Sequence, residues 1–226
     1  GADRTLPDAD LKARYRALVA ENHPDRAVAR GLPPATVEAT LADISYNPRV
    51  VALDRAQADE SRIAGPAPSF RDYLGRRLDA ARINGGRLQA ADLAPVLARI
   101  EASSGVSAPI LLGIWGMESN YGGYTGGFDL FRALASLAFD GRRRELFERE
   151  LEAAVRIVAE GRAPRERLVG SWAGATGQPQ FLPSSYLAHG ADGDGDGVRD
   201  IWYSRSDTLA SIARYLAANG WQRGQG

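Results

Sequence analysis

A glutamate near the middle of the chain, Glu118, has the chemical type and the local setting of a general acid. It lies in the run GIWGMESNYGG, over 113–123, where an apolar helix is expected to end in a glycine-rich turn. Leu111, Ile114 and Trp115 precede it at helical spacing, so Glu118 is predicted to lie on the apolar stripe. A carboxylic acid held against apolar surface has its ionised form disfavoured and can stay protonated near neutral pH. An ordinary glutamate at a frayed helix end is the alternative.

A second run, SWAGATGQPQFLPSSY over 171–186, combines small residues, aromatic rings and hydrogen-bonding side chains. Gln178 and Gln180 offer donors and acceptors, and Ser171 adds a hydroxyl. Neutral hydrogen-bonding groups beside aromatic rings suit a sugar, which has hydroxyls at its edges and apolar faces. Tight packing of a helical hairpin is the alternative, and composition alone favours it.

A third run alternates aspartate with glycine and has the spacing of a calcium loop. If Asp192 is position one, Asp194 and Asp196 fall at positions three and five, and Val198 offers its carbonyl at position seven. Asp200 takes position nine. Position twelve, normally a bidentate glutamate, is a tyrosine, so the predicted replacement ligand is the next acidic residue downstream, Asp207. A solvent-exposed acidic turn is the alternative.

Arginines at 142–144 open a predicted long helix, where the helix dipole favours acidic residues instead. An anionic ligand would explain Arg142 and Arg143 at this position. A solvated helix face, with the arginines paired to the glutamates at 145, 148 and 150, is the alternative.

The composition is that of a globular protein. The 226 residues include 28 basic and 28 acidic side chains, which gives no basic excess for nucleic acid. No apolar run approaches the ~18 residues that span a membrane. The chain has no cysteine and only two histidines, which excludes disulfides and thiolate metal sites and leaves little material for a Ser-His-Asp triad.

Helical periodicity dominates, and convincing alternating strands are absent, so the predicted fold class is all-α. Ser107 as N-cap and Pro109 in the first turn begin the helix that leads to Glu118. Glycine pairs such as Gly85-Gly86 are read as breaks. The chain is expected to divide into an N-terminal helical segment, 1–62, and a catalytic domain, 63–226, which includes the acidic loop 192–207. The other predicted helices cover 8–21, 34–44, 48–60, 69–83, 89–103, 131–139, 142–160, 183–189 and 207–219.

Together these runs resemble the lytic murein transglycosylase B family, over about 33–221. That family has a glutamate followed by Ser or Thr and an aromatic-Gly pair, matched by the run 118–122. It has a serine-aromatic-AGAxGxxQFxPSSY run, matched by 171–186, and a DGDG calcium loop ending in an aromatic, matched by 192–202. An Arg-Arg pair before the long helix is matched as well. The matches occur in the family's order and at similar separations.

The resemblance implies a lysozyme-like helical domain with a small EF-hand-like calcium loop, and cleavage of the MurNAc-β-1,4-GlcNAc bond of peptidoglycan to 1,6-anhydromuramoyl products. By carry-over, Glu118 is the sole acid/base catalyst, and Arg142 and Arg143 lie near the anionic peptide stem. The other expected substrate-binding residues are Ser119, Tyr121, Ser171, Gln178, Gln180 and Tyr215. A structural Ca²⁺ on the loop, glycan strands as partner, a periplasmic location and a monomer are also implied.

Two other functions compete with this one: a catalytically weak or inactive peptidoglycan-binding protein, and a muramidase that hydrolyses the same bond. The products separate the muramidase from the transglycosylase, because hydrolysis adds one water. One local departure from the family lies beside Tyr215, where Arg214 replaces the usual asparagine.

Overall fold

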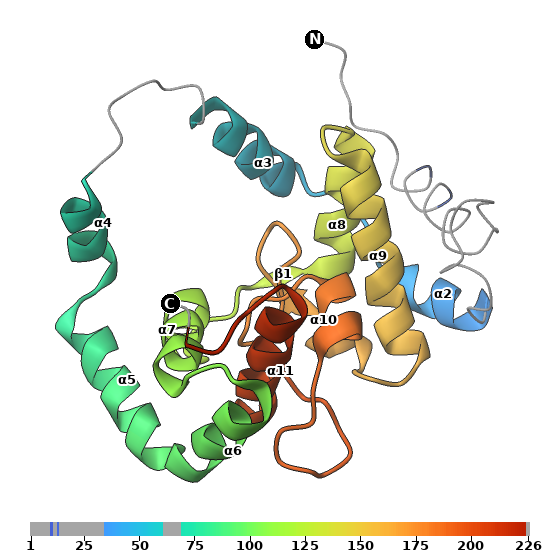
Figure 1. Cartoon of the computed structure of the whole chain (residues 1–226). Helices are drawn as coiled ribbons and strands as arrows, with labels where there is room; N and C mark the ends of the chain where they lie inside the picture. Colours follow the sequence, from blue (N-terminus) through green and yellow to red (C-terminus); the bar gives the residue numbers. More distant parts are fainter. Residues whose placement is uncertain (1–9, 11–12, 14–33, 61–68, 225–226) are drawn as a thin grey trace. The chain divides into compact units, whose positions relative to one another are not determined.

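The computed structural model describes residues 10, 13, 34–60 and 69–224, and helices dominate this part of the chain (Figure 1). The helices are α2 (Pro34–Leu41), α3 (Pro48–Glu60), α4 (Phe70–Arg77), α5 (Ala80–Asp92), α6 (Ala94–Ser104), α7 (Ala108–Ser119), α8 (Leu130–Asp140), α9 (Arg144–Ala159), α10 (Pro183–His189) and α11 (Arg205–Ala218), with a 3₁₀ helix at Arg165–Arg167. The helix predicted over 8–21 lies outside the described residues, except for Asp10 and Ala13.

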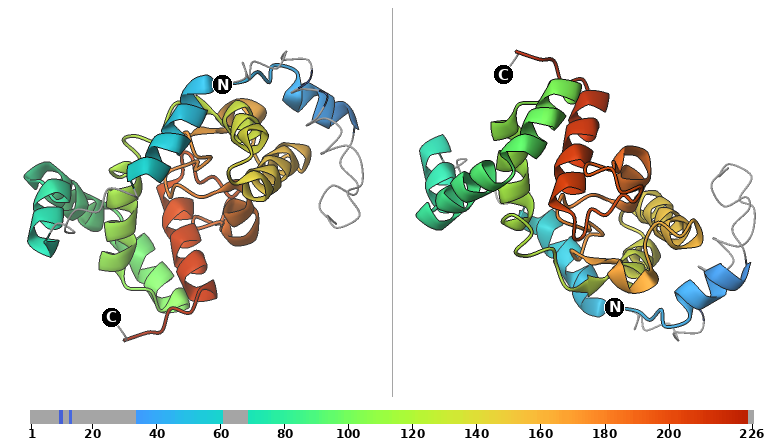
Figure 2. Two further views of the ribbon diagram at one scale, coloured as in Figure 1. Left: turned by 90° about the horizontal axis from the view of Figure 1, so that it is seen from above. Right: turned by 90° about the horizontal axis from the view of Figure 1, so that it is seen from below.

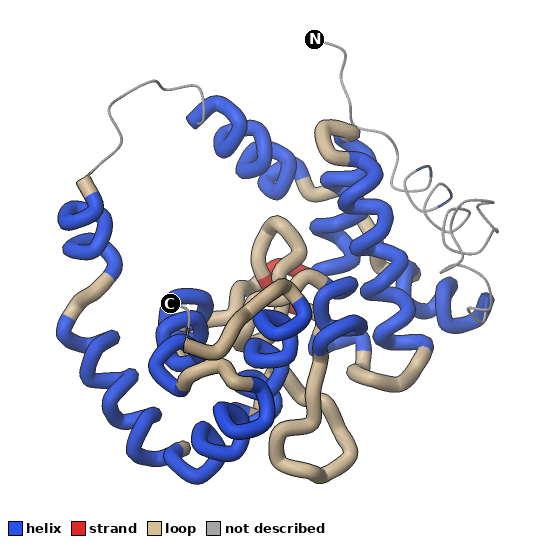
Figure 3. Tube along the Cα trace, viewed as in Figure 1, coloured by secondary structure: helices blue, strands red, loops and turns tan. Residues whose placement is uncertain are grey.

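Two short strands interrupt the helical order. β1 (Phe128–Asp129) and β2 (Val169–Gly170), drawn in red in Figure 3, pair antiparallel, with Phe128 opposite Gly170. Apart from this pair, the described residues confirm the predicted all-helical class.

The chain forms two compact units, each built from separate stretches of sequence. The first combines residues 1–62, 126–176 and 182–187, and the second combines 63–125, 177–181 and 188–226. The border after residue 62 coincides with the predicted end of the N-terminal segment. The described part of that segment packs with later residues of its own unit, and the functional division into 1–62 and 63–226 stays a prediction.

In the first unit, α8 is the central helix. Eight of its residues, from Leu130 to Ala138, are buried, and α9 and α3 pack against it. Asp129 caps its N-terminus by accepting a hydrogen bond of 2.8 Å from the Arg132 N–H. α2 packs on α9. α9 begins at Arg144, two residues later than predicted.

In the second unit, α7 is the central helix. It contacts α5, α6 and α11, and α6 also lies along α11 (Figure 2). The core joins apolar side chains of α6, α7 and α11, including Leu97, Leu111, Trp115 and Ile212. This unit holds the helix that carries Glu118 and also the acidic loop.

The Gly85-Gly86 pair lies inside α5, which corrects the prediction of a break there. The helix break comes earlier, where Asp79 caps α5 by accepting a hydrogen bond of 2.7 Å from the Arg82 N–H. The glycines instead allow the Tyr121 ring to approach α5. A Cβ on Gly86 would lie 2.6 Å from the Tyr121 hydroxyl.

Among the described residues, no single helix is long and apolar enough to cross a membrane. Within these residues, α6 and α7 taken together meet the length and composition criteria, and they are bent by 111° where they join.

Candidate functional site

Glu118 lies on the last turn of α7, at the border of the buried stripe. The helix starts as predicted, with Ser107 at the N-cap and Pro109 in the first turn. The Ser107 side chain makes no capping hydrogen bond; instead, the Ala108 N–H donates to the Glu101 carboxylate at 3.0 Å. The buried stripe runs through residues 111, 112, 115, 116 and 119. Glu118 itself is exposed, which corrects the prediction that it is buried on that stripe.

The border position still affects the acidity of Glu118. Partial desolvation by its neighbours raises the pKa of this carboxyl above its ordinary value. Exposure gives a substrate access to the group, while the raised pKa increases the fraction that holds a proton. This combination suits a general acid.

The turn after Glu118 is held in an uncommon backbone conformation. Asn120, Tyr121 and Gly122 have φ values of 51°, 59° and 82°, so two successive non-glycine residues are left-handed. Ser119 is buried, and its hydroxyl accepts a hydrogen bond of 3.0 Å from the Gly122 N–H. This hydrogen bond and the left-handed residues fix the direction of the chain where α7 ends.

Tyr121 packs beneath this turn. Its ring meets the Trp115 ring edge-on, with centroids 5.4 Å apart, and its hydroxyl donates to the Arg82 carbonyl at 3.1 Å. The predicted substrate residues Ser119 and Tyr121 are thus both engaged in local structure around Glu118.

The segment 177–181 supports the same end of α7. Gln180 has a φ of 51°, and its amide donates to the carbonyls of Thr125 at 3.0 Å and Gly177 at 2.9 Å. Gln178 is buried, and its amide bonds Trp115 and Trp202. The structure therefore brings Glu118, Ser119, Tyr121, Gln178 and Gln180 into one unit, with Gln178 inside it.

Tyr215 lies on α11 with 37% of its surface exposed. Its ring packs against Phe181, with centroids 5.4 Å apart, and against His189 at 5.2 Å. Arg214 points to another partner, donating to the Gly190 carbonyl at 3.3 Å. Burial, and secondarily the charge of Arg214, lowers the pKa of His189, so this helix-end histidine is biased toward its neutral form.

Ser171, Arg142 and Arg143 belong to the first unit. The Ser171 hydroxyl accepts a hydrogen bond of 3.0 Å from the Ala175 N–H and closes the glycine-rich turn. Both arginines form ion pairs with Asp54 of α3, a residue that the sequence analysis missed. Burial alone would raise the pKa of Asp54, but the hydrogen bonds and charges of the two arginines outweigh it and hold the pKa below the ordinary value.

Two arginines of the cluster thus pair with an aspartate of α3, a partner outside the three glutamates that the sequence suggested. Glu150 is buried and accepts hydrogen bonds from the Ser184 N–H at 2.9 Å and the Ser184 hydroxyl at 2.7 Å. Asp54 was detectable in principle, because it follows Val50 and Val51 at the spacing of one helix face, and a charge on that face needs a partner.

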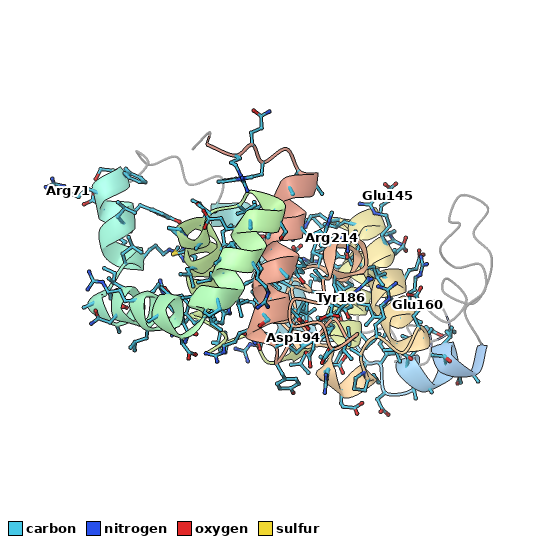
Figure 4. The ribbon with its side chains drawn as sticks, turned by 60° about the horizontal axis from the view of Figure 1, so that its bottom comes forward. Arg71, Glu145, Glu160, Tyr186, Asp194 and Arg214 are labelled. Atoms are coloured by element: carbon cyan, nitrogen blue, oxygen red, sulfur yellow. The ribbon has the colours of Figure 1, made fainter. Side chains whose placement is uncertain are left out.

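The acidic loop brings three of the predicted metal ligands together. Ligand oxygens of Asp192, Asp194 and Asp196, all exposed, lie within 4.8 Å of one another. Hydrogen bonds within the loop shape it: Asp192 accepts from the Gly195 N–H at 2.6 Å and from the Gly197 N–H at 2.8 Å. Figure 4 shows Asp194 in this loop and Arg214 on the helix that follows it.

The other predicted ligands, Val198, Asp200 and Asp207, lie outside this group of three carboxylates. Asp207 is buried on α11, and its carboxylate accepts from the Gly193 N–H at 2.8 Å and the Asp200 N–H at 2.7 Å. The Asp200 carboxylate accepts from the Trp202 N–H at 2.9 Å. Val198 is exposed on the loop. Asp207 therefore does not belong to the group formed by Asp192, Asp194 and Asp196. Its carboxylate instead holds the backbone of the loop through two N–H groups.

Comparison with known proteins identifies the fold. The family described as "Transglycosylase SLT domain" matches residues 15–226. Membrane-bound lytic murein transglycosylase B of Escherichia coli (strain K12) is 39% identical over 121 residues, which are 53% of this chain and 33% of that protein.

Solved structures agree. SltB3 from Pseudomonas aeruginosa, in complex with NAG-NAM-pentapeptide, superposes with a TM-score of 0.84 and 37% identity, covering 97% of this chain and 55% of SltB3. The Escherichia coli lytic transglycosylase Slt35, in complex with calcium, gives a TM-score of 0.81 and 26% identity, covering 100% of this chain and 67% of Slt35. This chain thus spans a third of the curated relative and about half of SltB3.

These matches confirm the predicted lysozyme-like helical fold and the resemblance on which it was based. The family match covers nearly the whole sequence, and the structural matches extend through both units. The chain belongs to the transglycosylase SLT domain family, among the relatives of lytic murein transglycosylase B.

Proposed function

We propose that this chain is a peptidoglycan lytic transglycosylase, which cleaves the MurNAc-β-1,4-GlcNAc bond and leaves a 1,6-anhydromuramoyl end. The family match supports this activity, and so do two complexes of the relative SltB3, one with NAG-NAM-pentapeptide and one with NAG-anhNAM-pentapeptide. That pair of ligands is a saccharide before and after formation of an anhydro ring.

The observation that carries the proposal is the state of Glu118. It is an exposed carboxyl with a raised pKa, at the end of a helix whose last turn is held by the bonds of Ser119, Tyr121 and Gln178. Protonation of a glycosidic oxygen requires a fixed acid that a polymer can reach, and a raised pKa favours the form that carries the proton.

In the proposed reaction, one carboxyl serves two steps. Glu118 first gives its proton to the leaving oxygen as the glycosidic bond breaks. The substrate's own N-acetyl group stabilises the sugar cation, a substrate-assisted route that replaces the usual second carboxylate. The ionised Glu118 then takes the proton of the muramoyl 6-hydroxyl, whose oxygen bonds to the anomeric carbon. The proton count balances without water.

Other residues are proposed to bind the glycan. Gln180 and Tyr215 lie in the unit of Glu118, and the 37% exposure of Tyr215 leaves ring surface for a sugar. Ser171 offers a half-buried hydroxyl at a tight turn. For Arg142 and Arg143 we propose contact with the anionic peptide stem, with Asp54 holding the two guanidinium groups in place.

A structural Ca²⁺ on the acidic loop is also proposed. The donor set fits, because three carboxylates converge within 4.8 Å and hard oxygen ligands suit this ion. The calcium complex of Slt35 supports the assignment. Asp192, Asp194, Asp196 and the Val198 carbonyl would hold the ion, with Asp200 acting through water. Asp207 would anchor the loop backbone. The ion would stabilise the loop and supply no step of the reaction.

Product analysis tests the activity. Isolated peptidoglycan digested by the chain should release anhydromuropeptides, and digestion in ¹⁸O-labelled water should leave these products unlabelled. Labelled, reducing-end muramic acid as the main product would establish hydrolysis instead. Tight binding without any release would establish a binding protein. Because the substrate is the bacterial wall, the proposed location is the periplasm, and the monomeric state stays a prediction.

A further inference from the structure

Gln178 occupies a buried position between two functional elements of the second unit. Only 6% of its surface is exposed. Its side-chain oxygen accepts a hydrogen bond of 3.0 Å from the Trp115 indole N–H, and its amide donates at 3.1 Å to the Trp202 carbonyl. One amide group thus bonds α7 on one side and the exit of the acidic loop on the other. Because the side chain is buried and both ends of its amide already have protein partners, little of it is accessible to a sugar.

On the α7 side, Gln178 contacts the turn that directs Glu118. Trp115 is fully buried one helical turn before Glu118, and its carbonyl accepts from the Ser119 hydroxyl at 3.4 Å. Gly122, left-handed at φ 82°, lies so close that a Cβ there would be 2.4 Å from the Gln178 side-chain oxygen. The side-chain oxygen of Gln178 therefore lies next to both Trp115 of α7 and Gly122 of the turn that follows α7.

On the loop side, the backbone of Gln178 adds a further bond. Its N–H donates to the Ile201 carbonyl at 2.9 Å, and Ile201 is fully buried. Asp200, one residue earlier, is tied to Asp207 on α11 through its own N–H. Gln178 is therefore anchored on a part of the loop that α11 itself fixes.

From these contacts we infer that Gln178 is a positioning residue for Glu118: it holds the end of α7 against the exit of the acidic loop and does not contact the glycan. This inference rests on the proposed function for its kinetic consequence. It replaces the substrate-binding role that the sequence predicted for Gln178. A residue of this kind fixes the angle at which the acid meets its oxygen, so it acts on turnover and not on binding.

The test compares Gln178→Met, which keeps the side-chain length, with Trp115→Phe, which removes the same hydrogen bond from its other end. Ser211→Ala is the matched control, because the buried Ser211 hydroxyl of the same unit accepts a hydrogen bond of 2.9 Å from the Ala191 N–H, and this bond does not involve a residue of α7. Rates are measured on a soluble fragment of two disaccharide-peptide units. Both bond-removing variants should lower kcat by about 10–100-fold with KM within about twofold, since small displacements of a catalytic group have effects of this size.

The double variant sharpens the result. If the Trp115–Gln178 bond carries the effect, Gln178→Met in the Trp115→Phe background should lower kcat much less than it does alone. Ser211→Ala should leave kcat near the wild-type value despite its loss of melting temperature. A raised KM with unchanged kcat for Gln178→Met would assign Gln178 to substrate binding and overturn the inference. So would a kcat loss no larger than that of the control.

A spectroscopic measurement tests the bond without activity. In ¹⁵N-labelled protein the Trp115 indole resonance, assigned by its absence in Trp115→Phe, should move to lower ¹H chemical shift in Gln178→Met and stay in place in Ser211→Ala. An unmoved resonance would overturn the inference. Wild-type chain that releases no product would reject the proposed function, whereas an active wild type with unaffected variants would reject the role of Gln178.

Discussion

The indole N–H of Trp115 donates a 3.0 Å hydrogen bond to the side chain of Gln178, 63 residues further along the chain. The bond joins the helix of Glu118 to a segment that sequence analysis assigned to sugar binding. It also explains why Gly122 is a glycine, since the space for its Cβ is filled by Gln178.

Gly122→Ala should destabilise the second unit. The residue is left-handed at φ 82°, and the added Cβ would lie 2.4 Å from the Gln178 oxygen, so the turn or the glutamine must move. We expect a loss of about 1–3 kcal/mol in unfolding free energy, measured by denaturant titration, together with reduced turnover.

Gly113→Ala is the control on the same helix. Gly113 lies within α7, and nothing is within 4 Å of its Cβ position. Alanine should therefore raise the stability by about 0.5–1 kcal/mol through helix propensity. If both glycine variants changed stability equally, close packing at Gly122 would not be the reason for its glycine.

Asp54→Asn should destabilise the first unit, because it leaves two arginines without their carboxylate. We expect a loss of about 2–3 kcal/mol at pH 7, below the value for a fully buried pair because both arginine side chains are 35% exposed. The native pKa of Asp54 is lowered, so its contribution is present above the ordinary value of 3.8 and is lost as pH falls through the native pKa.

Unfolding at two pH values checks this sign. The difference between wild type and Asp54→Asn should shrink from pH 7 to pH 3, while Asp43→Asn, at an exposed position, should change little at either pH. A difference that grows on acidification would contradict the ion-pair account.

Sequence patterns predicted much of this arrangement, and their failures have physical causes. The end of α7, the extent of α3 and the convergence of Asp192, Asp194 and Asp196 follow from local spacing. The hydrogen bonds of the Gln178 side chain could not be predicted from local patterns, because its partners, Trp115 and Trp202, are distant in sequence. The Asp54 ion pairs were missed for the same reason, since they span 88 and 89 residues.

Local rules also misjudged two positions. The Gly85-Gly86 pair predicts a break, yet α5 continues through it, and the Tyr121 ring occupies the space that side chains at these two positions would need. Glu118 was placed on the buried stripe, but the helix rotation carries it to the border. Periodicity predicts which face of a helix is buried with an uncertainty of about one residue. A residue at the edge of that face, such as Glu118, can therefore be exposed.

Calcium removal should lower the melting temperature. An ion bound only to the folded chain stabilises it by about 2.7 kcal/mol when present at 100 times its Kd. Chelator should therefore shift the melting curve downward, and Asp196→Asn should abolish most of that shift because it removes one of the three converging carboxylates. A melting curve unchanged after verified metal removal would show that the loop holds no stabilising ion.

Glu118→Gln should stabilise the fold at neutral pH. Desolvation raises the native pKa above the ordinary glutamate value of 4.5, so the ionised group destabilises the folded state. That destabilisation is absent at pH values below 4.5, where Glu118 is protonated in both the folded and the unfolded state. It develops as pH rises through the native pKa. The difference in melting temperature between Glu118→Gln and wild type should thus be larger at pH 7 than at pH 4, with the variant melting at the higher temperature. The opposite trend would show that Glu118 is stabilised as a carboxylate.

In the proposed reaction, Glu118 both delivers and accepts the proton of bond cleavage. The direct measurement is the rate of anhydromuropeptide release by wild type and by Glu118→Gln, with binding to the same insoluble peptidoglycan measured by co-sedimentation. The amide keeps the shape but transfers no proton, so we predict a rate loss of about 10⁴-fold with binding retained. Release of anhydromuropeptides by Glu118→Gln at an undiminished rate would contradict the account.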